Sequence, residues 1–200
     1  VALALAACVG VTAPPAPSSL PALVKAGLRV YAVGDIADCG RRRPEDTAAA
    51  LTAGLVPAGA FVLGLGDMAY PYADERTLAS CYEPTWGRHR VATIATPGNH
   101  DYVNGSAQGF LQYFSMPPAH EAGFVAFTRR LTDGWLLIAL DSNVTGSALQ
   151  TQYEWLERTL EREWDVPQGV EHGESRRCLL VMWHAPLYSS GLHRGSGERM

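Results

Sequence analysis

Five short apolar segments of the chain each end at a residue whose side chain can bind a metal ion. The end residues are Asp35, Asp67, Asn99, Asp141 and His184, which follow the segments 30–34, 61–66, 91–98, 136–140 and 179–183. Carboxylate, amide oxygen and imidazole suit hard or borderline cations such as Fe, Mn, Zn or Mg. Two such cations about 3.5–4 Å apart can clamp the attacking and leaving oxygens of an in-line displacement. These residue types therefore point to a metal site that could serve an in-line displacement.

The elements that must position these residues are buried β-strands. The five segments are rich in Val, Ile and Leu and are short, as is typical of strands with both faces covered. Pro44, Glu45 and Asp46 then predict a helix between the first two strands, so these strands should run parallel. Ligands of open α/β sheets bind beyond the carboxyl ends of the strands. We therefore expect an α/β fold with a polar site at one sheet edge.

The glycines before three of the polar residues are expected to allow close backbone approach next to a ligand; they are Gly34, Gly66 and Gly98. Residues 123–130 and 135–140 predict a hairpin. Ser147 begins a capping box, and the helix after it should place one apolar stripe against the core: Leu149, Tyr153, Leu156, Leu160 and Trp164. Asp141 is expected to accept a backbone bond from Ser142 or Asn143 in a turn.

Composition predicts a globular protein and excludes several classes. The 200 residues are 47% hydrophobic and 18% charged, which fits one domain with a real core. A net charge of −4 and the lack of a basic stripe give no nucleic-acid-binding surface. No apolar run reaches the roughly 18 residues that a membrane span requires. The sequence leaves the oligomeric state open.

The first residues are typical of an exported protein. Residues 1–8 resemble the end of a signal peptide, and Leu5-Ala6-Ala7-Cys8 resembles a bacterial lipobox, in which Cys8 would carry a lipid anchor to the membrane. The alternative is a plain cleaved signal. Residues 9–27, rich in Pro, Ser and Ala, are expected to be a linker. The predicted location is the periplasm, the cell surface as a lipoprotein, or the medium.

An exported chain can hold disulfides. Cys39 and Cys81 lie after the first two site-bearing strands, so we expect them to pair at the rim of the site. Cys178 opens an apolar strand and is expected to be a buried free thiol. The cysteine spacing does not fit a thiolate zinc site.

Four motifs in order resemble the calcineurin-like metallophosphoesterase superfamily: Gly34-Asp35, Gly66-Asp67-Met68-Ala69-Tyr70, Gly98-Asn99-His100-Asp101 and His184-Ala185-Pro186. Tyr70, together with Ala37 where most members have His, resembles the purple acid phosphatase branch. The resemblance covers roughly Leu28 to the end. It implies a calcineurin-like sandwich of two mixed β-sheets flanked by helices.

The resemblance also implies an activity. The expected reaction is hydrolysis of phosphate esters at a dinuclear centre with a metal-bound hydroxide as nucleophile, acting as an acid phosphatase-like phosphomonoesterase on a small phosphorylated substrate. The implied pair of ions is Fe(III) with Fe, Zn or Mn. The implied ligands are Asp35 and Tyr70 for the first metal, Asp67 as bridge, and Asn99 and His184 for the second. His100 would contact the phosphate, Asp101 would orient His100, and His193 would donate a proton to the leaving group.

One family motif is absent. The superfamily's last motif, Gly-His-x-His, does not occur before Met200, so we expect residues 28–200 to be a catalytic domain that is truncated at its C-terminus. His89, His120 and His172 are expected on the surface. Two alternatives stay open: a phosphodiesterase or nucleotidase on the same core, and a degenerate, non-catalytic domain that binds phosphate or metal.

Overall fold

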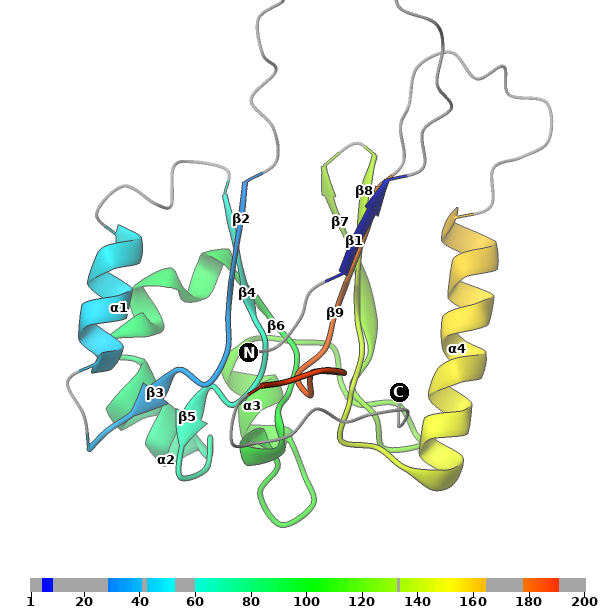
Figure 1. Ribbon diagram of the computed structural model, residues 1–200. Coiled ribbons are helices and arrows are strands. Elements are labelled where there is room, and N and C mark those ends of the chain that lie inside the picture. Colours follow the sequence, from blue (N-terminus) through cyan, green and yellow to red (C-terminus); the bar gives the residue numbers. More distant parts are fainter. Residues whose placement is uncertain are drawn as a thin grey trace, which may run out of the picture.

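The strands lie in two larger sheets with helices outside them, in a computed structural model that describes residues 5–8, 29–40, 43–52, 60–132, 134–164 and 178–190 (Figure 1). The first sheet is parallel, with the order β2 (Val30–Val33), β4 (Phe61–Gly64) and β6 (Thr93–Ala95). The second has the order β1 (Leu5–Cys8), β9 (Cys178–Met182), β8 (Trp135–Ala139) and β7 (Phe127–Thr132). In it, β8 and β9 are parallel and the outer pairs are antiparallel.

A short parallel pair, β3 (Ala37–Asp38) and β5 (Ala69–Tyr70), continues beyond the parallel sheet. The helices are α1 (Arg43–Thr52), α2 (Glu75–Thr77), α3 (Gln108–Tyr113) and α4 (Gly146–Trp164). Shorter helical turns span Leu78–Tyr82, Trp86–Ala92 and Asn99–Asp101. Helices α1 and α2 lie outside the parallel sheet and α4 lies outside the mixed sheet (Figure 1). Helix α3 shares a hydrophobic cluster with α1. Within the described residues, every helix is too short or too polar to span a bilayer.

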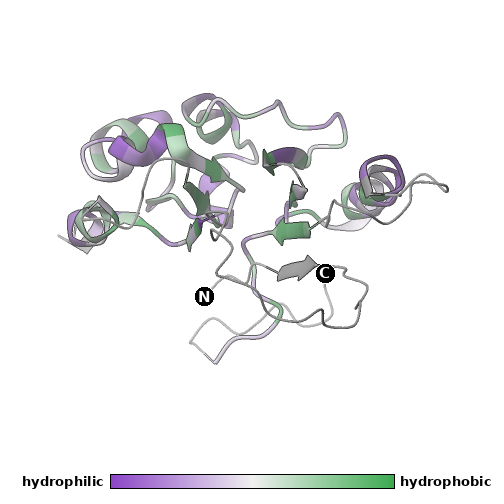
Figure 2. Ribbon diagram, turned by 90° about the horizontal axis from the view of Figure 1, so that it is seen from above, coloured by the Kyte–Doolittle hydropathy of each residue, from purple (hydrophilic) through white to green (hydrophobic). Residues whose placement is uncertain are grey.

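The two-residue repeat of the strands builds the layers. In β8, Leu137 and Ala139 face a cluster shared with Leu63 of β4, so this cluster joins the two sheets. Leu136 and Ile138 point the other way, into a cluster that contains residues of α4. Figure 2 shows the hydrophobic strands enclosed between the helices. This arrangement makes α/β the fold class, as expected; the complete strand set of the family's sandwich stays a prediction.

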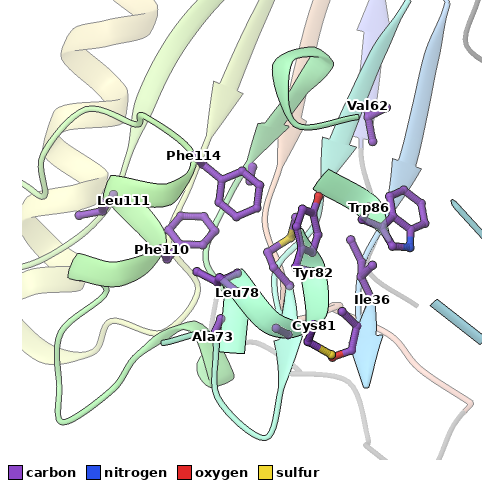
Figure 3. Packing of buried hydrophobic residues seen from close by; sticks show 14 of the residues in the cluster. Ile36, Val62, Ala73, Leu78, Cys81, Tyr82, Trp86, Phe110, Leu111 and Phe114 are labelled. Atoms are coloured by element: carbon purple, nitrogen blue, oxygen red, sulfur yellow. The ribbon is translucent and has the colours of Figure 1, made fainter. Parts of the chain in front are cut away.

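The third cluster lies between the parallel sheet and the helices α1 and α3. Figure 3 shows its aromatic part. Its centre is aromatic: the Tyr82 and Phe110 rings each lie against Phe114, with ring centroids 5.3 and 5.2 Å apart. The Cys39–Cys81 disulfide ties the loop after β3 to this cluster, which confirms the predicted pair. The helical turn that contains Cys81 is thereby fixed beside the strands that carry the polar site.

The expectation of a free thiol at Cys178 is wrong. Cys178 is disulfide-bonded, and none of the described cysteines is free. Its backbone lies opposite Cys8, because Leu5–Cys8 forms an edge strand antiparallel to β9. The residue pattern of 1–8 predicts an export signal and gives no sign of this long-range pairing.

The helix between the first two strands, their parallel pairing and the β7–β8 hairpin are confirmed. The expected stripe of α4 is partly wrong, because Tyr153 is 40% exposed while Gln152 and Thr159 are buried. His89 is also buried, with its Nε2 3.0 Å from Thr52 Oγ1 and 3.2 Å from Ala48 O. The predictions for the linker 9–27 and for His172 lie outside the described residues.

Candidate metal centre

The two strand-end loops that carry Asp35 and Asp67 are hydrogen-bonded to each other. Asp35 N donates to Gly66 O at 3.1 Å, and Ile36 N donates to Asp67 O at 3.0 Å. Asp35 and Asp67 have φ values of 56° and 52°, a left-handed conformation that Asp adopts more readily than most residues. Non-glycine residues held in this conformation cluster at functional sites. The parallel sheet therefore presents the two carboxylates side by side.

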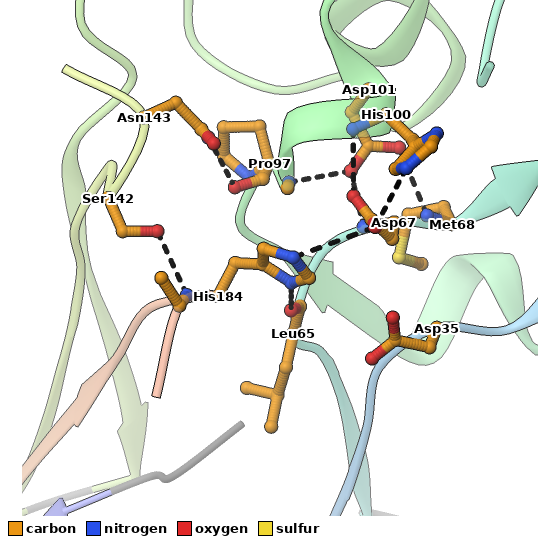
Figure 4. A network of polar contacts seen from close by, with 12 residues as sticks. Asp35, Leu65, Asp67, Met68, Pro97, His100, Asp101, Ser142, Asn143 and His184 are labelled. Carbon is orange, nitrogen blue, oxygen red and sulfur yellow. Dashed lines mark hydrogen bonds and ion pairs between the residues drawn. The ribbon is translucent and has the colours of Figure 1, made fainter. Parts of the chain in front are cut away.

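His184, from the end of β9, completes the cluster of candidate ligands. One donor atom from each of Asp35, Asp67 and His184 lies within 4.8 Å of the others. His184 Nε2 is 3.6 Å from Asp67 Oδ2, and the two side chains are 12% and 4% exposed (Figure 4). The site thus joins both sheets, since Asp35 and Asp67 follow strands of one sheet and His184 follows a strand of the other.

The hydrogen bond on the other ring nitrogen orients His184. Its Nδ1 lies 2.7 Å from Leu65 O, and because a carbonyl only accepts, Nδ1 carries the proton. In the neutral ring the lone pair then resides on Nε2, which faces Asp67. A histidine that donates one N–H to a backbone carbonyl is the usual arrangement of a metal ligand. His184 therefore fits a cation beside Asp67.

The Tyr70 hydroxyl lies between the two carboxylates. It donates to Asp35 Oδ1 at 2.6 Å and to Asp67 Oδ2 at 2.9 Å. Burial, reinforced by these two acceptors, raises the pKa of the Tyr70 phenol far above its ordinary value. The proton thus lies among three oxygen atoms, those of Tyr70, Asp35 and Asp67. Oxygen donors of this kind are the ligands that hard cations prefer. The donor set therefore fits a metal ion, which would replace that proton.

Asp101 supports this site through the backbone. Its carboxylate is 1% exposed and accepts from Asp67 N and Gly98 N, both at 2.7 Å, and from Met68 N at 3.0 Å. The expected contact with the His100 ring is not among these bonds, so Asp101 orients the Asp67 backbone instead. Burial raises the pKa of Asp101 to about 7, against the opposing effect of the three N–H donors.

The His100 imidazole is oriented by a different partner. Its Nδ1 lies 2.6 Å from Pro71 O, so this nitrogen donates and Nε2 faces the site, 3.9 Å from Asp67 Oδ2. Its backbone N donates to Asp67 Oδ1 at 2.8 Å. The ring of Tyr72, 53% exposed, lies 5.8 Å from the His100 ring. Neither contact could be predicted from the motifs. Any residue type can supply a backbone carbonyl such as Pro71 O, and Tyr72 lies outside the four motifs.

Two glycines are required by the close approach of these loops. A Cβ on Gly98 would lie 2.2 Å from Asp67 Oδ1, and one on Gly66 would lie 2.7 Å from His184 Nδ1. Gly66 also has a φ of 85°, where side chains are strained. The expectation that these glycines permit close approach is confirmed.

Two predicted site residues are not joined to the cluster by contacts of the described residues. Asn99 begins the turn Asn99–Asp101 and is exposed, and none of its described side-chain contacts reaches Asp67 or His184. His193 lies outside the described residues. The roles of these two residues therefore stay predictions.

Asp141 also ends a strand, and the predicted turn bond is confirmed because Asn143 N donates to Asp141 Oδ1 at 2.9 Å. The rest of its environment was not predictable from the motifs. Asp141 is fully buried and also accepts from Tyr102 OH and from Val125 N at 3.0 Å. Its carboxylate therefore holds neighbouring segments together and is not one of the clustered candidate ligands.

Comparison with known proteins agrees with this geometry. The family model of the calcineurin-like phosphoesterases matches residues 28–200. Searches of curated proteins and of solved structures found no match. The matched region contains the clustered residues Asp35, Asp67 and His184. The chain therefore belongs to the calcineurin-like phosphoesterase family and is a metal-dependent hydrolase of phosphoric ester bonds.

Proposed function

We propose that this chain is a dinuclear, purple acid phosphatase-like phosphomonoesterase. The observation that carries the proposal is the Tyr70 hydroxyl held by both Asp35 and Asp67, with His184 Nε2 beside the same Asp67 oxygen. A phenol between two carboxylates distinguishes this site from one built on carboxylates and imidazoles alone. It supports a tyrosine ligand and hence the purple acid phosphatase branch.

The proposed ligands are divided between two positions. Asp35 and Tyr70 would hold the first ion, Asp67 would contact both, and His184 and Asn99 would hold the second. A phenolate with carboxylates favours a hard ion such as Fe(III), and an imidazole with an amide oxygen accepts Fe, Zn or Mn. When bound, the two ions supply an activated water and neutralise charge on the phosphoryl group.

The residues around these ligands have distinct tasks. His100 presents Nε2 to the site because Pro71 O fixes its Nδ1, so the imidazolium form would donate to a phosphoryl oxygen. Asp101 holds the backbone of Asp67 and Gly98 and thereby fixes the bridging carboxylate. His193 is proposed as the proton donor to the leaving alkoxide, on the sequence resemblance alone.

Export is part of the proposal, and the Cys39–Cys81 disulfide supports it because such bonds persist in oxidising compartments. Lipidation at Cys8 would require cleavage directly before it, which would remove Leu5 to Ala7 from β1. The anchor and the complete edge strand are therefore alternatives. Mass spectrometry of the mature N-terminus separates a lipidated Cys8, a plain cleaved end and an intact β1.

The test is metal content by elemental analysis together with turnover of p-nitrophenyl phosphate and bis-p-nitrophenyl phosphate, on the full-length protein. About two ions per chain with monoester preference is the expected result. Asp67→Asn should lose metal and nearly all turnover. Asp46→Asn is the matched control, because Asp46 is an exposed carboxylate in the first turn of α1.

Each other outcome has a definite meaning. Preference for the diester would replace the monoesterase proposal with a phosphodiesterase on the same core. Metal binding without turnover of either substrate would support a degenerate binding domain. Full activity in Asp67→Asn would exclude Asp67 as the bridging ligand.

A further inference from the structure

The segment Asp141–Asn143, which follows β8, connects the two halves of the metal site. We call residues 141–143 the β8 bracket. Asp141 is 0% exposed, and its two carboxylate oxygens accept four hydrogen bonds, from Tyr102 OH, Val125 N, Asn143 N and Asn143 Nδ2. A buried carboxylate with all its acceptor capacity used is fixed in one orientation. The bracket is therefore a rigid element.

One side of the bracket holds the turn that carries Asn99 and His100. Asn143 Nδ2 donates to Pro97 O at 3.1 Å, and Tyr102 OH donates to Asp141 Oδ2 (Figure 4 draws the first of these bonds). Pro97 and Tyr102 lie directly before and after the segment 98–101. Both ends of the turn are thus bonded to the bracket.

The other side of the bracket holds the His184 loop and a helix. Ser142 Oγ accepts from Ala185 N, the residue after His184, at 3.0 Å (Figure 4). Asp141 N donates to Gln152 Oε1 at 2.8 Å, and Gln152 Nε2 donates to Asp141 O at 2.9 Å, which anchors the bracket to α4. The bracket therefore contacts the loops of both sheets at the point where the candidate ligands meet.

We infer that Asn143 is a positioning residue for the phosphoesterase reaction: through Pro97 it sets where the Asn99–Asp101 turn places His100 relative to His184. This inference rests on the proposed function for its catalytic consequence. The physical basis is that the amide of Asn143 is bonded at once to Asp141 Oδ1, at 3.0 Å, and to Pro97 O. Loss of this amide frees one end of the turn and leaves the carboxylate ligands untouched.

Asn143→Ala in the full-length protein tests the inference, with Thr145→Ala, at an exposed position two residues later, as control. Outer partners of a metal site typically contribute 10–100-fold, so kcat should fall about tenfold in Asn143→Ala and stay unchanged in Thr145→Ala. Tyr102→Phe removes the hydroxyl that bonds the other end of the turn and keeps the aromatic ring. It should also lower kcat, and it tests the inference if Asn143→Ala does not fold.

A double-mutant cycle distinguishes an effect of Asn143 that acts through His100 from a general loss of order in the site. In a His100→Ala background, Asn143→Ala should lower kcat by less than about twofold, because its effect is already lost. A further tenfold loss in that background would overturn the inference. So would an unchanged kcat in a folded Asn143→Ala protein.

A second readout does not depend on activity. In metal-free protein, Asn143→Ala should shift the imidazole NMR resonances of His100, and Thr145→Ala should not. Unmoved His100 resonances would contradict the inference even if kcat falls. If the wild type hydrolyses no phosphate ester, the proposed function fails, and this NMR comparison still decides whether the bracket positions His100.

Discussion

The Tyr70 hydroxyl lies 2.6 Å from Asp35 Oδ1 and donates its proton to that oxygen. The same hydroxyl donates to Asp67 Oδ2 at 2.9 Å, so one proton is shared by a group of three oxygens. The phenol stays neutral at ordinary pH in this setting because burial and the two carboxylates raise its pKa. A cation bound at the same place would reverse the effect, since it favours the phenolate. On the proposed ligand set, the protonation state of Tyr70 should therefore differ between metal-free and metal-loaded protein.

Replacement of Tyr70 by Phe tests its role as a ligand. The proposed Fe(III)–phenolate pair should give a visible absorption band in the iron-loaded wild type, and Tyr70→Phe should lose it while thermal unfolding shows a folded protein. Tyr72→Phe is the control, because the exposed Tyr72 ring packs near His100 and donates to neither carboxylate in the bonds described. An unchanged spectrum in Tyr70→Phe would remove Tyr70 from the metal.

Removal of metal should lower stability only in proteins with an intact site. A ligand that binds the native state alone stabilises it by about 2.7 kcal/mol at a free concentration 100-fold above its Kd. A chelator should therefore lower the unfolding midpoint of the loaded wild type. His184→Ala should start lower and respond less, since it removes the imidazole beside Asp67. Equal chelator responses of His184→Ala and wild type would show that the metal binds elsewhere.

The sequence predicted the candidate ligands because each belongs to a local pattern. Asp35 and Asp67 end apolar strands of a strand–helix–strand unit, and strand ends of parallel sheets meet at one edge. That rule, with the ordered motifs, was enough to bring Asp35, Asp67 and His184 together. The division into two sheets was expected from the family resemblance alone, and the pairing of β1 with β9 was not predicted, because strand pairing over long sequence distances leaves no local pattern.

The errors on α4 and Asp101 have one physical cause. Gln152 is buried on α4 because its amide bonds the backbone of Asp141 in both directions, which offsets the cost of burying a polar group. The helix is therefore rotated so that Tyr153 faces solvent. Asp101 likewise bonds backbone N–H groups rather than the His100 ring. Such side chain-to-backbone bonds depend on tertiary geometry and have no signature in residue types.

Gly98→Ala should disable the candidate metal site although it replaces none of the candidate ligands. The added Cβ would lie 2.2 Å from Asp67 Oδ1 and 2.5 Å from Asp67 N, so the Asp67 carboxylate must move. Overpacking of this kind costs about 1–3 kcal/mol, and metal content should fall with it. Gly40→Ala is the control, because the nearest atom to its Cβ would be an Asp38 carboxylate oxygen at 3.3 Å. Full metal content in Gly98→Ala would contradict the close packing.

The Cys39–Cys81 bond should contribute stability through the loop it closes. The two cysteines are 42 positions apart, and closure of a loop of this length stabilises by about 4 kcal/mol in the chain-entropy model. Non-reducing peptide mapping should show this pair. The Cys39→Ser, Cys81→Ser double variant should unfold at lower urea, and a single-Ser variant should gain no stability over it. Equal urea midpoints for the double variant and the oxidised wild type would show that the bond is strained or absent in solution.

Asp101 should give the metal-free protein an unusual pH dependence. Its pKa is about 7 when folded against an ordinary 3.8, because burial penalises the charged form. Between these values the native state binds more protons than the unfolded state, so the free energy of unfolding should fall as pH rises from about 4 to 7. Asp74 and Glu163 have lowered pKa values, so their effect on the free energy of unfolding falls at lower pH. Asp101→Asn should flatten this slope in chelator-treated protein, as urea unfolding at several pH values would show, and Asp46→Asn should keep it. A slope that persists in Asp101→Asn would assign it to another group.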